Sequence, residues 1–104
     1  MKVANLYEAK EWFEVLQATS RSQTAVMTLE GGGESSEQPD FHPNSDQVLL
    51  VVEGEVSAEI SGETASMRAG DVVIVPAGAR HKFSNPTTAR AVTFSVYAPP
   101  AYPE

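Results

Sequence analysis

The chain has 104 residues, a length typical of one domain. Seven Lys and Arg against fourteen Asp and Glu give a formal net charge of −7. Nucleic acids and anionic membranes are both bound through basic side chains, so this charge argues against either as a partner. The absence of cysteine excludes disulfides, thiolate metal sites and a cysteine nucleophile. The composition predicts one small, acidic, globular domain over residues 1–104.

The first residues lack the apolar core of a signal peptide. No apolar run approaches the roughly 20 residues that span a bilayer. We therefore expect a cytoplasmic protein.

Residues 5–19 carry an ambiguous pattern. Ala9, Trp12, Phe13 and Leu16 follow helical spacing, whereas residues 12–16 also read as a strand. We predict one short helical turn followed by a strand.

From residue 22 onward, short apolar runs alternate with turns that contain Gly or Pro. The strands are expected at residues 24–29, 47–52, 56–61, 71–75, 80–83 and 89–97. Two of them, 47–52 and 71–75, are uninterrupted apolar runs, as expected of strands buried on both faces. About seven to nine short strands in this arrangement predict an all-β sandwich or barrel. The polar connection over residues 31–39 includes three consecutive glycines and is expected to form a mobile turn at the barrel rim.

Both histidines of the chain lie beside turns that end apolar strands. His42 precedes a turn-like stretch at residues 43–46. If this stretch closes a hairpin, His42 and Gln47 face each other across the ladder, with Asp40 on the same face. A carboxylate, an imidazole and an amide oxygen would then meet at the mouth of an apolar interior. In the alternative, His42 is an ordinary solvated or core histidine, and Asp40 and Gln47 are turn and strand residues.

Residues 70–85, GDVVIVPAGARHKFSN, resemble the second cupin motif, G-x5-P-x-G-x2-H-x3-N, at every fixed position. Pro76 ends the preceding strand, and His81 then projects inward with Phe83 on the same face. The resemblance implies that His81 is a metal ligand.

The first cupin motif, G-x5-H-x-H-x3–4-E-x6-G, is partly matched. Gly54 matches its last glycine, and Gly33 lies one residue out of register with its first. Gln47 falls on the Glu position, His42 on the second His and Asp40 on the first. The C-terminal stretch VYAPP is similar to a small bacterial cupin subgroup in which Glu-x-His and Gln replace His-x-His and Glu. The resemblance covers about residues 22–97 and implies the cupin jelly-roll, a β-barrel or sandwich, preceded by a short N-terminal segment.

The resemblance thus implies one metal ion held by Asp40, His42, Gln47 and His81. Two imidazoles, one carboxylate and one neutral oxygen suit Fe, Mn, Ni, Co or Zn. With a single carboxylate the complex keeps about +1 net charge, which suits polarising a bound oxygen. If Gln47 binds weakly, the other three residues form a two-His-one-carboxylate set, as in non-haem Fe(II) oxygenases. A metal-free pocket is the alternative.

Three function classes fit these residues. The first is a metal-dependent oxygenase or isomerase that acts on a small organic molecule. The second is a non-catalytic module that binds or senses a small molecule. The third is a metal-free cupin in which His81 acts as a general base, as in sugar epimerases of the family. The fold does not separate an enzyme from a binder, because it hosts many chemistries.

Further expectations concern partners and pocket walls. We expect a homodimer and no nucleic acid or membrane partner. Four side chains have apolar outer faces that fit either a buried second sheet or a partner subunit: Val48, Leu50, Val52 and Val73. Three aromatic side chains are expected either in the pocket wall or in the core or dimer interface: Trp12, Phe13 and Phe41. The alternatives for Tyr97 are an acid and a part of the pocket wall. Asp71 and Asn85 are expected to be structural, and Arg80 and Lys82 to point away from the site.

Overall fold

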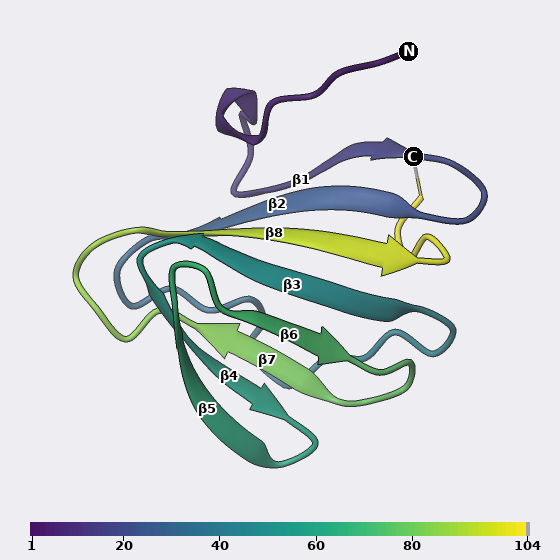
Figure 1. Cartoon of the computed structure of the whole chain (residues 1–104). Helices are drawn as coiled ribbons and strands as arrows, with labels where there is room; N and C mark the ends of the chain where they lie inside the picture. Colours follow the sequence, from purple (N-terminus) through teal and green to yellow (C-terminus); the bar gives the residue numbers. More distant parts are fainter. Residues whose placement is uncertain (104) are drawn as a thin grey trace.

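The computed structural model describes residues 1–103 and consists of two antiparallel β-sheets (Figure 1). One sheet has the strand order β1-β2-β8-β3-β6 and the other the order β5-β4-β7. The elements are a short 3-10 helix, η1 (Leu6–Glu8), and the strands β1 (Phe13–Ala18), β2 (Gln23–Leu29), β3 (Asp46–Glu53), β4 (Glu55–Ile60), β5 (Glu63–Arg68), β6 (Val72–Val75), β7 (His81–Ser84) and β8 (Ala91–Ala98). The predicted all-β jelly-roll is confirmed. Within residues 1–103, no helix has the length and hydropathy needed to cross a membrane.

The N-terminal prediction is also confirmed, since one helical turn precedes the first strand. The Asn5 side chain caps this turn by accepting a hydrogen bond of 2.9 Å from the Tyr7 N–H. The strand that follows, β1, pairs with β2 and forms one edge of the larger sheet.

The core lies between the two sheets, and β3 shows how its residues are sorted. Leu49 and Val51 are fully buried, whereas Val48, on the opposite face, is 37% exposed. The prediction that residues 47–52 are buried on both faces is therefore wrong. The outer face of the larger sheet is not covered by the smaller sheet at this point, so alternate side chains reach solvent.

The same correction applies to the strand predicted at residues 71–75. Val75 is 2% exposed, but Val72 and Ile74 are 58% and 60% exposed, because β6 is an edge strand of the larger sheet. Val73 was expected on the outer face. It instead pairs with Leu49 and packs against the core.

The loop over residues 33–42 runs antiparallel beside β7 and covers the free edge of that strand. Isolated bridges join Glu34 to Ser84 and Asp40 to His81. The predicted hairpin between His42 and Gln47 is wrong, because Gln47 pairs with Val75 and Tyr97. The loop therefore reaches the site along β7 and not along β3.

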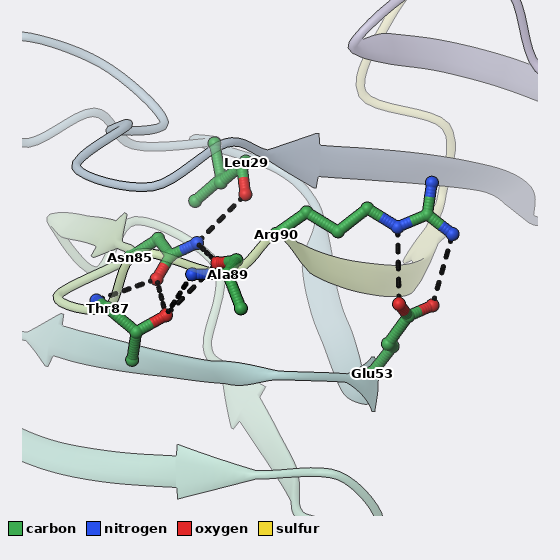
Figure 2. Close-up of polar contacts among 6 residues, drawn as sticks. All are labelled: Leu29, Glu53, Asn85, Thr87, Ala89 and Arg90. Carbon is green, nitrogen blue, oxygen red and sulfur yellow. Dashed lines mark hydrogen bonds and ion pairs between the residues drawn. The ribbon is translucent and has the colours of Figure 1, made fainter.

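Asn85 closes the connection between β7 and β8 (Figure 2). Its side chain is 1% exposed, and its Nδ2 donates to the carbonyls of Leu29 (2.9 Å) and Ala89 (2.7 Å). Its Oδ1 accepts from the backbone N–H and the hydroxyl of Thr87, at 2.9 and 2.8 Å. The structural role expected for Asn85 is confirmed.

Two glycines are required by close backbone approaches. A Cβ at Gly54 would lie 2.5 Å from the Arg90 carbonyl oxygen, and its φ of +80° is unfavourable for other residues. A Cβ at Gly31 would lie 2.9 Å from the Thr87 carbonyl oxygen. The glycine-rich turn thus packs against the Asn85 connection, at the opposite end of β7 from His81. Beside Gly54, Glu53 pairs with Arg90 at 3.2 Å (Figure 2).

Candidate metal centre and pocket

A cavity of about 260 Å³ lies between the sheets at the end of the barrel where β7 begins and β8 ends. Its wall includes three of the four predicted ligand residues, Asp40, Gln47 and His81. Trp12 and Phe13 also line it, which is one of the two locations expected for these aromatic side chains. Phe41 is 47% exposed and is not part of this wall.

His81 is the first residue of β7 and is 6% exposed. As expected, it shares the inner face of the strand with Phe83, and the two rings lie 5.9 Å apart. Its Nδ1 lies 3.2 Å from the Ala79 carbonyl oxygen. A carbonyl only accepts, so Nδ1 carries a hydrogen. This contact fixes the orientation of the ring and leaves Nε2 as the nitrogen that could bind a metal.

His42 lies on the loop that follows Asp40 and is partly buried. Its carbonyl oxygen accepts a 2.8 Å hydrogen bond from the Gly78 N–H, which holds the loop against the turn before His81. The ring centroids of His42 and His81 are 5.1 Å apart. Burial, and then the neighbouring His81, lower the pKa of His42, while Asp40 partly opposes them. The imidazole is therefore held in its neutral form, which is the form that binds metals.

Gln47 is 3% exposed. Its Nε2 donates to the Ser95 hydroxyl at 3.1 Å, but among residues 1–103 its Oε1 has no hydrogen-bond partner. A buried polar atom left unpaired costs roughly 1–3 kcal/mol. The unpaired oxygen thus calls for a cation or a hydrogen-bond donor that the chain itself does not supply.

Asp40 is exposed at the rim, and its backbone exchanges two 2.8 Å hydrogen bonds with that of His81. Its Oδ1 accepts from the Phe41 N–H at 2.8 Å. Within the described part of the chain, no three His, Cys, Asp or Glu side chains are grouped so as to hold a metal ion. The fold therefore brings the four predicted residues to one end of the barrel without joining the carboxylate to both imidazoles. A ligand role for Asp40 stays a prediction.

Two tyrosines complete the site. Tyr97 is 2% exposed and contacts His42 edge-on at 5.1 Å. Burial strongly raises the pKa of Tyr97, so its phenol stays neutral. Tyr102 folds back from the C-terminal tail and places its hydroxyl 3.5 Å from His42 Nε2. Tyr102 was missed because it follows the strand on which the cupin resemblance ends, and only its position after the Pro99–Pro100 pair signals a chain reversal.

Arg80 and Lys82 point away from the cavity, as expected. Arg80 donates to the Pro39 carbonyl at 3.2 Å. Lys82 donates to the Glu37 carbonyl at 2.8 Å and pairs with the Glu34 carboxylate. Both cations therefore fasten the loop to β7 and leave the interior without a fixed positive charge from these side chains.

Comparisons with solved structures show which proteins share this fold. The fold matches BH2720 from Bacillus halodurans with a TM-score of 0.87 over 95% of this chain and 78% of that chain, at 22% identity. TT1209 from Thermus thermophilus matches with a TM-score of 0.82 over 95% of this chain and 98% of that chain, at 25% identity. A sugar phosphate isomerase from a cupin superfamily, SPO2919 from Silicibacter pomeroyi, matches with a TM-score of 0.72 over 84% of this chain and 59% of that chain, at 26% identity.

The curated relatives that match are longer proteins, and this chain spans between 20% and 53% of their length. The family model described as "Cupin domain" matches residues 25–97, which run from β2 to the end of β8. With this match over most of its length and two antiparallel sheets that match known cupin structures, the chain belongs to the cupin family.

Proposed function

We propose that this chain binds one divalent transition-metal ion through His42, His81 and Gln47, with Asp40 as a further donor at the rim. The adjoining cavity would hold a small organic molecule for oxygenase- or isomerase-type chemistry. The observation that carries the proposal is the unpartnered, buried Oε1 of Gln47, which lies in the wall of the same cavity as His81.

The donor set suits Fe, Mn, Ni, Co or Zn, since two neutral imidazoles and oxygen donors are the ligands that these ions accept. Bound there, such an ion would polarise an oxygen atom of the small molecule or of water. No cysteine is present to favour a soft metal.

The chain's own residues prepare the cavity for this chemistry. The Ala79 carbonyl orients His81, and Ser95 holds the Gln47 amide with its oxygen unpaired. Phe83, 1% exposed, adds an apolar side chain to the cavity wall, with its ring 5.9 Å from that of His81. The volume of about 260 Å³ lies below the roughly 300–1,000 Å³ of sites for drug-sized ligands. The proposed ligand is therefore a small molecule.

The first test is elemental analysis of protein purified without added metal and then loaded with zinc. We expect about one equivalent of zinc per chain, lost in both His42→Ala and His81→Ala. The matched control is Arg21→Ala, which removes an exposed side chain between β1 and β2 that does not line the cavity. Equal zinc in the wild type and in both histidine variants would overturn the proposal.

A second test separates enzyme from binder. Protein loaded anaerobically with Fe(II) is mixed with oxygenated buffer and a panel of phenols and diketones, and oxygen consumption is recorded. Consumption that depends on one compound, and that His81→Ala abolishes, supports an oxygenase. No consumption across the panel would favour isomerase chemistry or binding without turnover.

One observation supports a second candidate, a metal-free isomerase. No group of three acidic or histidine side chains assembles within residues 1–103, while His81 lines the cavity and the Ala79 carbonyl contacts its Nδ1 and not its Nε2. In this candidate His81 takes up a proton from a carbon next to a carbonyl group. Activity that survives chelation of all metal would favour it over the metal centre.

We further propose that the chain forms a homodimer. Three apolar side chains on the outer face of β3 and β6 are exposed: Val48, Val72 and Ile74. Val48 belongs to the patch that the sequence analysis expected, whereas Val72 and Ile74 take the place of Val73, which packs against the core. Sedimentation of the wild type as a dimer and of Ile74→Glu as a monomer would support this interface, and a monomeric wild type would refute it.

A further inference from the structure

Resting on the proposed metal centre, we propose that Tyr102 is an additional ligand of that centre and binds the ion through its phenol oxygen. Tyr102 lies beyond the residues matched by the cupin family model, which end at residue 97. The inference concerns a residue of the C-terminal tail to which neither cupin motif assigns a role.

The tail is fastened over the site by a buried side chain. Gln23, on β2, is 1% exposed. Its Oε1 accepts from the N–H groups of Ala101 and Tyr102, each at 3.0 Å, and its Nε2 donates to the Tyr102 carbonyl at 2.8 Å. The whole amide of Gln23 is thus used to hold the backbone of Tyr102. The position of the tyrosine is therefore set by the barrel and not by a loose chain end.

The ring of Tyr102 is held on three sides by other aromatic rings. Its centroid lies 4.8 Å from Phe13, 5.2 Å from Tyr97 and 5.4 Å from His42. Edge and tilted contacts at such distances favour a single ring orientation. In that orientation the hydroxyl faces His42 Nε2.

The distance between the Tyr102 hydroxyl oxygen and His42 Nε2 fits two ligand atoms that bind one ion. At 3.5 Å the pair is longer than a good O–H···N hydrogen bond, which measures about 2.7–3.0 Å. Two ligands bound at about 2.0–2.1 Å to one ion lie roughly 2.9–3.4 Å apart for octahedral to tetrahedral angles. A shift of a few tenths of an ångström therefore brings Tyr102 into position as a ligand.

The charge of the site favours the same role. Gln47 carries no charge, and the Asp40 carboxylate lies at the rim, where it accepts from the Phe41 N–H. A phenolate would supply a negative charge next to the divalent ion. As the bond from the Tyr102 oxygen to the ion forms, its O–H bond breaks and the proton passes to solvent water, with no change of oxidation state.

Copper(II) is the probe for this inference, because a phenolate bound to copper(II) gives an intense visible absorption band that imidazole and amide ligands do not produce. We titrate metal-free wild type, Tyr102→Phe and Tyr7→Phe with copper(II), and determine bound copper by elemental analysis. Tyr7 is the control, because it is 59% exposed and does not line the cavity. The band should appear in the wild type and Tyr7→Phe and be absent from Tyr102→Phe. The Tyr102→Phe variant should also bind zinc about tenfold more weakly.

Gln23→Leu supplies a second variant that keeps Tyr102 but releases the tail, and it should also lose the band. Far-ultraviolet circular dichroism of each variant confirms that the barrel is intact. Copper bound by the wild type without the band, or an unchanged band in Tyr102→Phe, would overturn the role of Tyr102 and leave the metal centre standing. Absence of bound copper and zinc in the wild type would overturn the metal centre, and the tyrosine ligand with it.

Discussion

Buried polar side chains near the two ends of β7 differ in whether their hydrogen bonds are complete. At one end, Asn85 uses its amide nitrogen and its amide oxygen in four hydrogen bonds to neighbouring groups (Figure 2). At the other end, the oxygen of Gln47 has no partner within residues 1–103, and the imidazole of His42 has only a long contact to Tyr102. A buried side chain whose hydrogen bonds are all made within the chain stabilises the fold. A buried polar atom without a partner indicates a side chain that binds a ligand.

The largest effect on stability is expected at the Asn85 end of β7. Asn85→Ala leaves the carbonyls of Leu29 and Ala89 without their donor and opens the turn held by Thr87. We expect the free energy of unfolding to fall by about 2–4 kcal/mol, measured by urea denaturation. Zinc affinity of the folded fraction should be unchanged, and a loss of less than about 0.5 kcal/mol would contradict the structural role.

Gly54→Ala tests the backbone that joins β3 to β4. The new Cβ would meet the Arg90 carbonyl oxygen at 2.5 Å, at a φ of +80°. Strain at such a residue costs about 1–3 kcal/mol, so the urea midpoint should fall clearly. The matched control is Gly62→Ala, where φ is +83° but no atom lies within 4 Å. Equal losses in the two variants would show that the close approach to Arg90 contributes nothing.

Gln47→Leu tests the other end of β7, where the cavity lies. Here the effect on stability should have the opposite sign to that of Asn85→Ala. The variant removes a buried oxygen that has no partner and replaces it with an apolar side chain of similar size. We expect the metal-free protein to be unchanged or up to about 1 kcal/mol more stable, while zinc affinity falls roughly tenfold or more. A loss of about 2 kcal/mol or more without an effect on zinc binding would assign Gln47 to the core.

The smallest expected effect is the pH dependence of the metal-free protein. The pKa of His42 is lowered from 6.5, chiefly by burial, so below about pH 6.5 the unfolded chain binds more protons than the folded chain. The contribution of His42 to stability is present above that pH and is lost as the pH falls through its folded pKa. Urea denaturation at about pH 7.5 and about pH 5.5 should show a smaller drop in His42→Gln than in the wild type. An identical drop in both proteins would exclude His42 as a source of this pH dependence.

The local part of this architecture could be predicted from the sequence. The fixed spacing of the second cupin motif placed His81 inward at the start of its strand, with Phe83 on the same face. These features depend on neighbours within one strand or turn, so the inward direction of His81 was predicted correctly. The jelly-roll was predicted through the resemblance to the cupin motifs.

The non-local part could not be predicted from the sequence. Asp40 pairs with His81, some forty residues further along the chain. The hairpin predicted between His42 and Gln47 does not form, because Gln47 pairs with Val75 and Tyr97. The exposure of Ile74 follows from the edge position of β6, which depends on the strand order of the whole sheet. Tyr102 reaches the site only through its backbone hydrogen bonds to Gln23, 79 residues away.

The most direct measurement of the central claim is X-ray absorption spectroscopy at the zinc edge of protein loaded with one equivalent of zinc. If His42, His81 and Gln47 form a metal centre, the spectrum will show two imidazole nitrogens with oxygen donors around the ion. His42→Ala and His81→Ala, prepared with the same amount of zinc, should each lose one imidazole contribution. An all-oxygen environment without imidazole in the wild type would contradict the account, because the zinc would then sit on surface carboxylates.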